Sequence, residues 1–542
     1  KPGNDGALCG AVLTCSKGAC SPVTTPGWAR QLSMHASGRH ACVVKNDGTV
    51  ACWGYNNNGQ CGDGTKTNAK QPVAVPALKD VTTVEAGGYH TCALLKDGTV
   101  TCWGDNYYGQ LGDGSKDDSV KPVVVKGLSG VAAVSASAYG TCALSKNGGV
   151  KCWGRNFDKE VGGGSTETSV TAPSDTGLSQ VTSLSGGYYH ACAVKKDGST
   201  WCWGANSYQQ SQPGTSSSDI AAPVLVKGLS KAVGVGSSGY GSCFLDGKGT
   251  LSCIGRNSDG ELGIGASTPS DSGELIYTPL KVADVVQVAG TYGGVIALDK
   301  TGHIWTWGDN SDGQQSNGST TDVLAPVKRI APAGVIQVAG GYDSYCVLLK
   351  SGSVWCVGDN VYGTLGNGSA TDNKVYQRVI DGSCKTNADC DGGDGCYANT
   401  CDAQTGLCTT VITKDKACDD GEPCTVSDAC DAAGKCVAKA KDCSDTDACT
   451  TTPSCDAKTG ACSQLGKVDC DDMNPCTTDA CDVKTGECSS KAIAGCKWTC
   501  KADADCDDGE PCTADKCLSL TGVCEQKAGN DGAICGTASI CA

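Results

Sequence analysis

The chain has 542 residues, of which 41 are cysteine, and a net charge of −15. Metal sites would need close Cys-x-x-Cys pairs with histidine partners, but no such pair occurs and only five histidines are present. The composition therefore favours disulfides and predicts a protein that is secreted, extracellular or attached to the cell surface. No apolar stretch approaches 18 residues, so we expect no membrane insertion.

Residues 1–22 are expected to form a partial cysteine-rich module, followed by a linker at 23–27. The segment Gly3-Asn-Asp-Gly-Ala-Leu-Cys9-Gly10 is nearly repeated as Gly529-Asn-Asp-Gly-Ala-Ile-Cys535-Gly536. This match suggests a segment of a longer chain, or a protomer whose ends meet those of its neighbours. The cysteines of the possible assembly junction are Cys9, Cys15, Cys20, Cys535 and Cys541.

Residues 28–380 contain seven copies of a motif that recurs about every fifty residues. The clearest copy runs from Val84 to Gly114. Within each copy, apolar residues occupy alternate positions in short runs, and turns rich in Gly and Asp separate the runs. This pattern predicts short antiparallel strands. A Trp-Gly-x-Asn element recurs, and its asparagine is present in all seven copies: Asn56, Asn106, Asn156, Asn206, Asn257, Asn310 and Asn360. About four strands in each copy predict the blades of a β-propeller.

The hairpin inside each copy predicts which cysteines meet. Lys96-Asp97-Gly98 reads as a three-residue hairpin turn, which places Cys92 directly opposite Cys102. Opposed residues in an antiparallel pair are close enough for a disulfide, and buried free cysteines are the alternative. The same offset predicts six disulfides: Cys42–Cys52, Cys92–Cys102, Cys142–Cys152, Cys192–Cys202, Cys243–Cys253 and Cys346–Cys356. The sixth copy has Ile296 and Thr306 at these positions, so both cysteines are missing together.

The segment Trp-Gly-x-Asn-x-x-Gly-Gln-Leu-Gly-x-Gly, complete at Trp103 to Gly114, resembles the repeat of the regulator-of-chromosome-condensation family. The resemblance covers about residues 28–380, and it implies a seven-bladed propeller. The expected fold class is therefore all-β, with disulfide-rich and loop-dominated modules on either side. The sequence does not decide which strand closes the ring.

Residues 384–542 are expected to be tandem cysteine-rich modules that form a stalk. The unit Cys418 to Cys436 recurs three times, and it resembles the short slime-mould-type cysteine repeat, as does the partial module at 1–22. Units of about twenty-five residues cannot bury a core, so disulfides must hold them. Four cysteines allow three pairings, and the sequence does not choose among them. Residues 1–380 carry 29 acidic and 29 basic side chains, so the whole surplus of −15 lies beyond them.

Few residues suggest a ligand site. The acidic run Asp503, Asp505, Asp507, Asp508 and Glu510 holds weak calcium candidates, although solvated turn carboxylates are the simpler explanation. His40, His90 and His190 occupy one slot in three copies, which indicates a structural role. Cys61 has no hairpin partner, so it is either a buried residue or the partner of a cysteine outside the propeller. No confident metal site, cofactor or catalytic residue is predicted.

Two functions remain open. The first is an extracellular structural or adhesive protein, in which propellers and cysteine-rich connectors assemble end to end with copies of this chain into a surface fibre. The second is a secreted recognition or inhibitor module that binds an unidentified protein as a monomer. A rim rich in tyrosines (Tyr107, Tyr108, Tyr208 and Tyr362) suits the second function. Nucleic acid is not an expected partner, because the chain has no basic patch.

Overall fold

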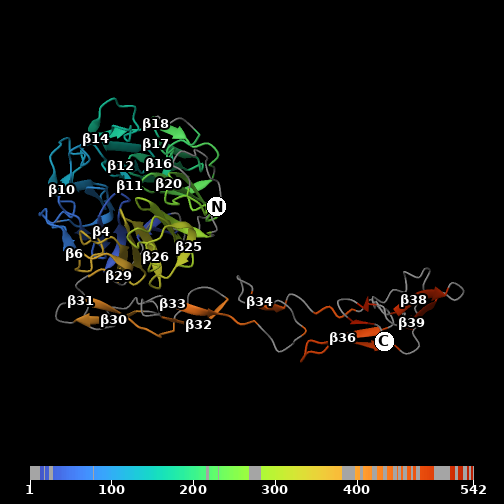
Figure 1. Cartoon of the computed structure of the whole chain (residues 1–542). Helices are drawn as coiled ribbons and strands as arrows, with labels where there is room; N and C mark the ends of the chain where they lie inside the picture. The colour runs from blue at the N-terminus through green and yellow to red at the C-terminus, as the bar shows by residue number, and fades with distance from the viewer. Residues whose placement is uncertain are drawn as a thin grey trace. The chain divides into compact units, whose positions relative to one another are not determined.

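All the regular secondary structure of the described residues is β-strand, and seven of the sheets form a propeller (Figure 1). The computed structural model describes residues 13–16, 19–22, 28–76, 78–214, 219–229, 231–267, 282, 284–380, 397–402, 407–417, 424–430, 436–443, 449, 453–455, 461–464, 468–471, 477–493, 513–518, 523–528, 534–535 and 539–540. The all-β class and the seven-bladed propeller predicted from the sequence are confirmed.

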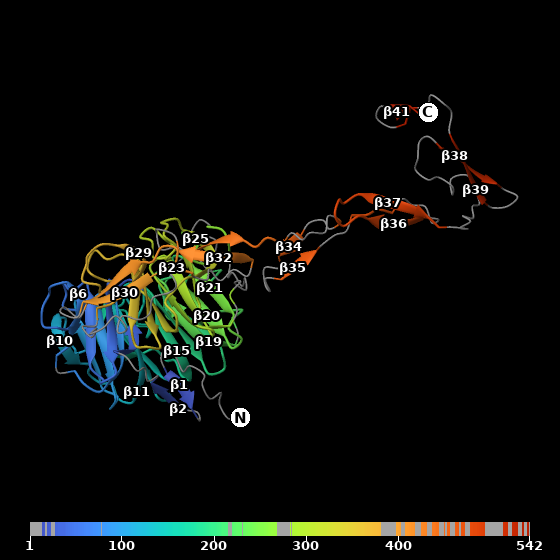
Figure 2. The ribbon, with the colours of Figure 1, turned by 90° about the horizontal axis from the view of Figure 1, so that it is seen from below.

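Each blade is a sheet whose strands follow chain order, and Figure 2 shows the propeller turned by 90°. The blades are, in order, β3 Ala29–Ser33, β4 His40–Lys45, β5 Val50–Gly54 and β6 Ala69–Ala74; β7 Val81–Ala86, β8 His90–Leu95, β9 Val100–Gly104 and β10 Ser119–Val124; β11 Val131–Ala136, β12 Gly140–Ser145, β13 Val150–Arg155 and β14 Ser169–Asp175; β15 Val181–Gly186, β16 His190–Lys195, β17 Thr200–Gly204 and β18 Ile220–Leu225; β19 Ala232–Ser237, β20 Gly241–Asp246 and β21 Leu251–Gly255; β22 Val285–Gly290, β23 Gly294–Asp299, β24 Ile304–Gly308 and β25 Val323–Arg329; β26 Val335–Gly340, β27 Ser344–Leu349, β28 Val354–Gly358 and β29 Asn373–Arg378. Blade five has three strands within the described residues.

The hairpin between the second and third strands has the turn expected from its sequence. Gly98 adopts a φ of 88°, which a side chain would disfavour, and the Leu95 amide donates to the Thr99 carbonyl at 2.8 Å. The Asp97 carboxylate accepts a 2.9 Å hydrogen bond from the Thr99 amide, which supports the turn. Cys92 and Cys102 are therefore register partners.

Neighbouring blades are joined by the tryptophan of the repeated element. The Trp103 indole is fully buried, and its N–H donates to the Gln60 carbonyl of the preceding blade at 2.9 Å. The same bond is made by Trp53 to Thr364, Trp153 to Gln110, Trp203 to Glu160 and Trp307 to Glu261, at 2.7–2.8 Å. Ile254 and Val357 take this position in blades five and seven and cannot donate.

The asparagine of the element braces its own loop in every blade. Its side-chain oxygen accepts the amide of the residue five positions later, as in the 2.9 Å bond from Leu111 to Asn106. The equivalent bonds run from Cys61, Val161, Ser211, Leu262, Gln315 and Leu365 at 2.8–3.2 Å. The asparagines are therefore loop supports, because a buried amide must find such partners.

Side chains and loops close the ring, because no described strand of the first blade enters the last blade's sheet. The Gln337 amide on β26 accepts from the Leu32 amide at 2.9 Å and donates to the Leu32 carbonyl at 2.7 Å. The Tyr342 amide donates to the Gly38 carbonyl at 2.9 Å. One apolar core cluster spans both blades and includes Leu32 and Leu348.

The remaining described strands form two-stranded hairpins: β1 Leu13–Ser16 with β2 Ala19–Pro22; β30 Tyr397–Asp402 with β31 Leu407–Ile412; β32 Thr425–Cys430 with β33 Cys436–Ala440; β34 Pro453–Cys455 with β35 Cys462–Gln464; β36 Thr477–Cys481 with β37 Cys488–Ala492; β38 Thr513–Leu518 with β39 Val523–Ala528; β40 Ile534–Cys535 with β41 Ser539–Ile540. The chain divides into two compact structural bodies. The first comprises residues 1–418 with 430–436, and the second comprises residues 419–429 with 437–542. The described part of the chain holds no helix able to cross a bilayer.

Candidate functional site

A closed circuit of tyrosines surrounds one face of the propeller. Most of them come from the loop between the first and second strands of a blade, immediately before the second strand, where Tyr89 precedes His90. We call this set the tyrosine belt: Tyr55, Tyr89, Tyr139, Tyr188, Tyr189, Tyr240, Tyr292, Tyr342 and Tyr362. Every belt residue is half-buried, so each ring packs sideways and still faces solvent.

The belt rings contact one another in sequence. Tyr89 stacks on Tyr139 with ring centroids 5.0 Å apart, and Tyr292 stacks on Tyr342 at 4.5 Å. The circuit closes through Arg39, whose guanidinium lies 4.4 Å from the Tyr342 ring centroid and 5.5 Å from that of Tyr362. These stacked and cation–π contacts hold the rings in place. The belt is therefore an ordered surface that loses little side-chain freedom when a partner binds.

Three apolar side chains stand exposed beside the belt, and we call them the crown. Tyr107 is 68 % exposed, Phe157 50 % and Val361 56 %. Tyr108 joins crown to belt, because its ring lies 4.8 Å from Tyr107, 5.9 Å from Phe157 and 5.6 Å from the belt ring of Tyr139. Exposed apolar groups of this size gathered on one face indicate an interaction surface.

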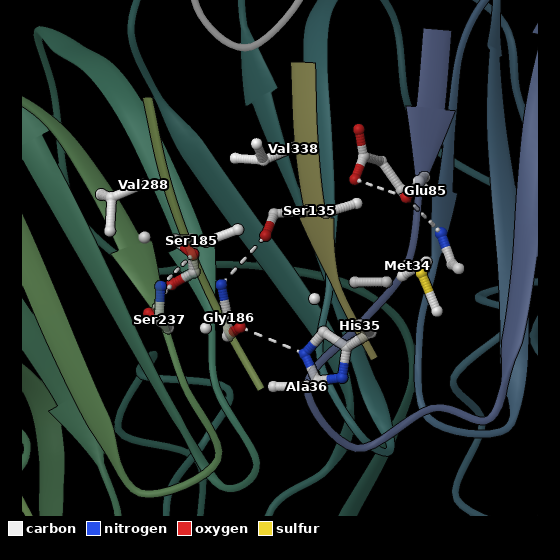
Figure 3. Close-up of a pocket in the computed structure, with 18 of the residues that line it drawn as sticks. Met34, His35, Ala36, Glu85, Ser135, Ser185, Gly186, Ser237, Val288 and Val338 are labelled. Carbon is white, nitrogen blue, oxygen red and sulfur yellow. Dashed lines mark hydrogen bonds between the residues drawn. The ribbon is translucent and has the colours of Figure 1, made fainter. Parts of the chain in front are cut away.

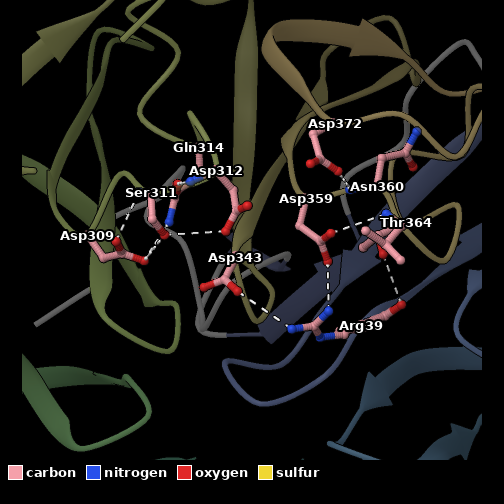
Figure 4. A network of polar contacts seen from close by, with 11 residues as sticks. Arg39, Asp309, Ser311, Asp312, Gln314, Asp343, Asp359, Asn360, Thr364 and Asp372 are labelled. Carbon is pink, nitrogen blue, oxygen red and sulfur yellow. Dashed lines mark hydrogen bonds and ion pairs between the residues drawn. The ribbon is translucent and has the colours of Figure 1, made fainter. Parts of the chain in front are cut away.

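Charges on this face are mostly paired, except beside Arg39 (Figure 4). Arg39 bonds Asp359 at 3.3 Å and lies 3.8 Å from Asp343, while Asp309 and Asp312 lie nearby. Burial, reinforced by the charges of Asp312 and Asp309, raises the pKa of Asp343 to about 7. This sector of the face therefore holds more carboxylate than arginine.

The innermost strands of the seven blades line a central cavity of about 170 Å³ (Figure 3). Serines at one inner-strand position join neighbouring blades. Ser33 accepts from the Ala86 amide, Ser135 from Gly186 and Ser185 from Ser237, each at 3.0 Å. At the same position blade two has Glu85, whose carboxyl group accepts a 3.4 Å hydrogen bond from the Ser33 hydroxyl. No ion pair to Glu85 forms within the described residues.

His35 reaches across the channel from blade one to blade four. Its Nε2–H donates to the Gly186 carbonyl at 3.1 Å, and its Nδ1 accepts from the Ser37 amide at 3.2 Å. This pattern requires the neutral imidazole, and burial lowers the pKa of His35 to about 4 in agreement with it. Among the residues that the structure describes, His35 and Glu85 are the only titratable side chains that line the cavity.

Replacing Glu85 by glutamine is expected to stabilise the propeller most at high pH. Burial raises the folded-state pKa of Glu85 from 4.5 to about 8. At a pH between these two pKa values, Glu85 is ionised in the unfolded chain but protonated in the folded chain. The contribution of Glu85 to the unfolding free energy therefore falls as pH rises through this range. Urea unfolding at pH 5 and pH 8 should show that the unfolding free energy of E85Q, relative to that of the parent, increases with pH. His35 is present in both proteins, so its titration cancels in this difference. An advantage that does not change with pH would contradict the assignment.

The three recurring histidines hold adjacent blades together. Nε2–H of His40 donates to the Thr91 hydroxyl at 2.9 Å, and His90 and His190 bond Thr141 and Ser242 at 2.8 and 2.9 Å. All three side chains are buried, and burial lowers their pKa values to about 3, 3 and 4. Their rings lie in three different blades, and no group of three or more potential metal ligands occurs among the described residues.

The structure brings all six expected cysteine pairs together as disulfides, with Cα atoms 4.0–4.1 Å apart in Cys42–Cys52, Cys92–Cys102, Cys142–Cys152, Cys192–Cys202, Cys243–Cys253 and Cys346–Cys356. In blade six, Ile296 faces Thr306 at the same place. Each disulfide closes a short loop, which the chain-entropy account values at about 2–3 kcal/mol.

Blade six supplies a control for the disulfides. Replacing Cys192 and Cys202 by isoleucine and threonine, as in blade six, is expected to lower the free energy of unfolding by about 2–3 kcal/mol. Replacing both by serine should cost more, because buried hydroxyls would be added without new apolar packing. Denaturant midpoints of the two variants test this order. Equal midpoints would show that packing at this position adds nothing.

Other expected residues lie elsewhere. Cys61 is buried and free, and burial raises the pKa of its thiol well above the usual value. Cys15 and Cys20 are register partners in β1 and β2, and Cys535 on β40 pairs in register with Ser539. Cys9, Cys541 and the calcium candidates Asp503, Asp505, Asp507, Asp508 and Glu510 lie outside the described residues.

The sequence pointed to Tyr107, Tyr108, Tyr208 and the belt residue Tyr362, but it did not predict the other belt tyrosines, Arg39 or Glu85. A signal for the belt existed, because a tyrosine recurs just before the second strand in Gly-Tyr89-His, Ala-Tyr139-Gly and Gly-Tyr240-Gly. No comparable signal marks Arg39 or Glu85, since each occurs in one blade only. Their roles depend on neighbours from other blades.

Profiles of the regulator of chromosome condensation (RCC1) repeat match residues 33–60, 81–110, 131–159, 181–210, 285–314 and 335–364 in one version, and 47–94, 97–144 and 301–348 in another. RCC1 repeats build the propeller. The Dictyostelium (slime mold) repeat matches residues 417–440, 469–493 and 505–527 beyond the RCC1-repeat propeller. The expectation that residues 1–22 carry this repeat was wrong, because they hold three cysteines where the repeat has four.

Solved structures share the fold of the RCC1-repeat propeller. Prp20p from Saccharomyces cerevisiae, described with its binding properties to Gsp1p and histones, is 20 % identical, with a TM-score of 0.54 over 64 % of this chain and 87 % of that one. Yeast RCC1 (Prp20) bound to Kap60 is 20 % identical, with a TM-score of 0.54 over 67 % and 89 %. Human WBSCR16 is 20 % identical, with a TM-score of 0.51 over 63 % and 95 %. A search of curated protein sequences finds no match to this chain.

Proposed function

We propose that this chain is an extracellular protein-binding protein whose propeller, within residues 28–380, holds a protein partner against the tyrosine belt and the crown. The observation that carries the proposal is the closed circuit of ring contacts, with Tyr107 and Phe157 exposed beside it. Tyrosines offer large contact area at low entropic cost, and they are enriched where proteins meet. The disulfides support an oxidising, extracellular location.

The fold relatives give this proposal support. Prp20p binds Gsp1p and histones, and it also occurs in a complex with Kap60. A propeller of this fold therefore suits protein recognition.

Replacing Tyr107 and Phe157 together by serine is expected to weaken partner binding by about ten-fold or more, because exposed aromatic anchors dominate such interfaces. The partner would first be cross-linked to the full chain in an extracellular fraction, then purified and titrated directly. Val124→Ser is the matched control, because Val124 is 58 % exposed on β10 and belongs to neither belt nor crown. Equal loss of affinity in both variants, or none in the aromatic variant, would argue against this face.

A second candidate is the subunit of an extracellular fibre, with cysteine-rich connectors in residues 384–542. The near-identity of residues 3–10 and 529–536 favours it, because a segment that recurs on both sides of the propeller suits repeated contacts between copies. Negative-stain electron microscopy of unreduced protein separates the two candidates. Beaded filaments would support the fibre, and isolated single propellers would support the binding module.

A further inference from the structure

The cysteine-rich units share one hairpin geometry. Four units carry four cysteines each: Cys418, Cys424, Cys430 and Cys436; Cys443, Cys449, Cys455 and Cys462; Cys470, Cys476, Cys481 and Cys488; Cys506, Cys512, Cys517 and Cys524. The third and fourth cysteines of a unit face each other across the hairpin, as Cys455 does with Cys462 and Cys481 with Cys488. In the propeller such opposed cysteines are bonded to each other, but here they are not.

The disulfides of these units follow a different rule. Within a unit, the first cysteine pairs with the fourth, in Cys443–Cys462 and Cys470–Cys488. Between units, the second cysteine pairs with the third cysteine of the next unit, in Cys424–Cys455 and Cys449–Cys481. Within the described residues each kind of bond occurs twice at equivalent positions, so the connectivity repeats along this part of the chain.

The backbone repeats the same junction. The Lys441 amide donates to the Cys424 carbonyl at 2.8 Å, and the Val468 amide donates to the Cys449 carbonyl at 2.8 Å. In both cases the donor stands two residues before the first cysteine of a unit, and the acceptor is the second cysteine of the preceding unit. Successive units therefore meet through one covalent bond and one matching hydrogen bond.

The disulfide loops overlap without a break. The loop closed by Cys424–Cys455 contains Cys443 and Cys449, where the loops closed by Cys443–Cys462 and Cys449–Cys481 begin. The loop closed by Cys449–Cys481 in turn ends within the loop closed by Cys470–Cys488. We propose that residues 424–488 are a covalently interlocked tether that carries tension along the chain without unravelling. Units of this size lack a core that could resist force by packing, so the bonds between units must do so. This inference goes beyond the proposed function and does not depend on it.

The pairing rule is tested by cutting the full chain between two units. A recognition sequence for a site-specific protease, inserted after Lys467, separates the second unit from the third. Without reductant the two fragments should stay joined through Cys449–Cys481. They should separate in C449S/C481S and stay joined in C443S/C462S, which loses only a bond within a unit. Separation of the parent fragments, or a Cys449–Cys455 bond in non-reducing peptide mapping, would overturn the rule.

The rule also predicts a bond that the structure does not describe. Cys476 is the second cysteine of the third unit and lies outside the described residues, while Cys517 is the third cysteine of the fourth. Peptide mapping should recover Cys476 linked to Cys517. A bond from Cys476 to Cys481 would contradict the repeat of the pattern.

Tension is tested by stretching the full chain by its two ends in a single-molecule instrument without reductant. Replacing Cys424, Cys455, Cys449 and Cys481 by serine removes both bonds between units. The covalent path from Cys424 to Cys488 through the described bonds then grows from about 13 to about 27 residues, so the fully extended chain should become longer. C443S/C462S should leave the extended length unchanged, because the shortest covalent path does not pass through that bond. Equal lengths for the fourfold variant and the parent would overturn the tether.

Discussion

A Trp103→Ala variant is expected to lose about 3–5 kcal/mol of unfolding free energy. The indole is fully buried between blades, and it belongs to the cluster that joins blade one to blade two. Removing it leaves a cavity at that junction, which a rigid ring of blades cannot collapse to fill. Urea unfolding of the oxidised protein, followed by far-ultraviolet circular dichroism, measures the loss.

Two variants separate packing from hydrogen bonding at this position. Trp103→Phe keeps most of the ring and loses only the donor to the Gln60 carbonyl, which still accepts a 2.8 Å bond from the Thr91 hydroxyl. Its cost should therefore be clearly smaller than that of Trp103→Ala. Tyr107→Ala removes an exposed aromatic and should change stability by no more than about 0.5 kcal/mol. If Trp103→Phe costs as much as Trp103→Ala, the hydrogen bond rather than the packing holds the blades.

A Gln337→Glu variant is expected to lower the free energy of unfolding by about 3 kcal/mol or more. The Gln337 side chain is 3 % exposed, and its amide meets both polar groups of the Leu32 backbone. A carboxylate of the same shape can accept a hydrogen bond from the Leu32 amide, but it cannot donate one to the Leu32 carbonyl. Its negatively charged oxygen would instead face the partially negative carbonyl oxygen. The bond that closes the ring would therefore be replaced by a repulsion.

Gln287→Glu is the matched control for this closure. Gln287 makes the same two bonds to Val338, at 2.9 and 3.0 Å, but it is only half-buried and joins blades that follow each other in the chain. We therefore expect a smaller loss of stability in Q287E than in Q337E. Hydrogen exchange should also show faster opening of β3 and β26 in Q337E. Equal losses would mean that closure contributes nothing beyond an ordinary blade contact.

Local sequence patterns predicted much of the propeller because its hairpins are local. The three residues Lys96 to Gly98 specify a turn, and the turn alone sets Cys92 opposite Cys102. The same local logic did not extend to the cysteine-rich units. Cys455 lies opposite Cys462, yet each is bonded elsewhere, because those bonds depend on how successive units meet.

The candidate site was predicted only in part. Tyr107, Tyr108, Tyr208 and Tyr362 were assigned to an exposed rim. Tyr107 is the most exposed large apolar side chain among the described residues, but Tyr108, Tyr208 and Tyr362 are half-buried. Tyr362 belongs to the belt, but the rest of the belt was not predicted. Tyr89 and Tyr139 are fifty residues apart, and only the angle between adjacent blades brings their rings to 5.0 Å.

By itself, the sequence determined the number of blades, because the motif recurs seven times. It also determined the hairpin register and the six disulfides of the propeller, because these follow from turns and alternation within about ten residues. Only the tertiary structure decided how the ring closes, that Glu85 lies in the central cavity with His35, and how Arg39 completes the belt. Gln337 and Leu32 are 305 residues apart, and no local pattern relates them. Contacts between blades depend on the closed ring, since its curvature alone decides which side chains of neighbouring blades meet.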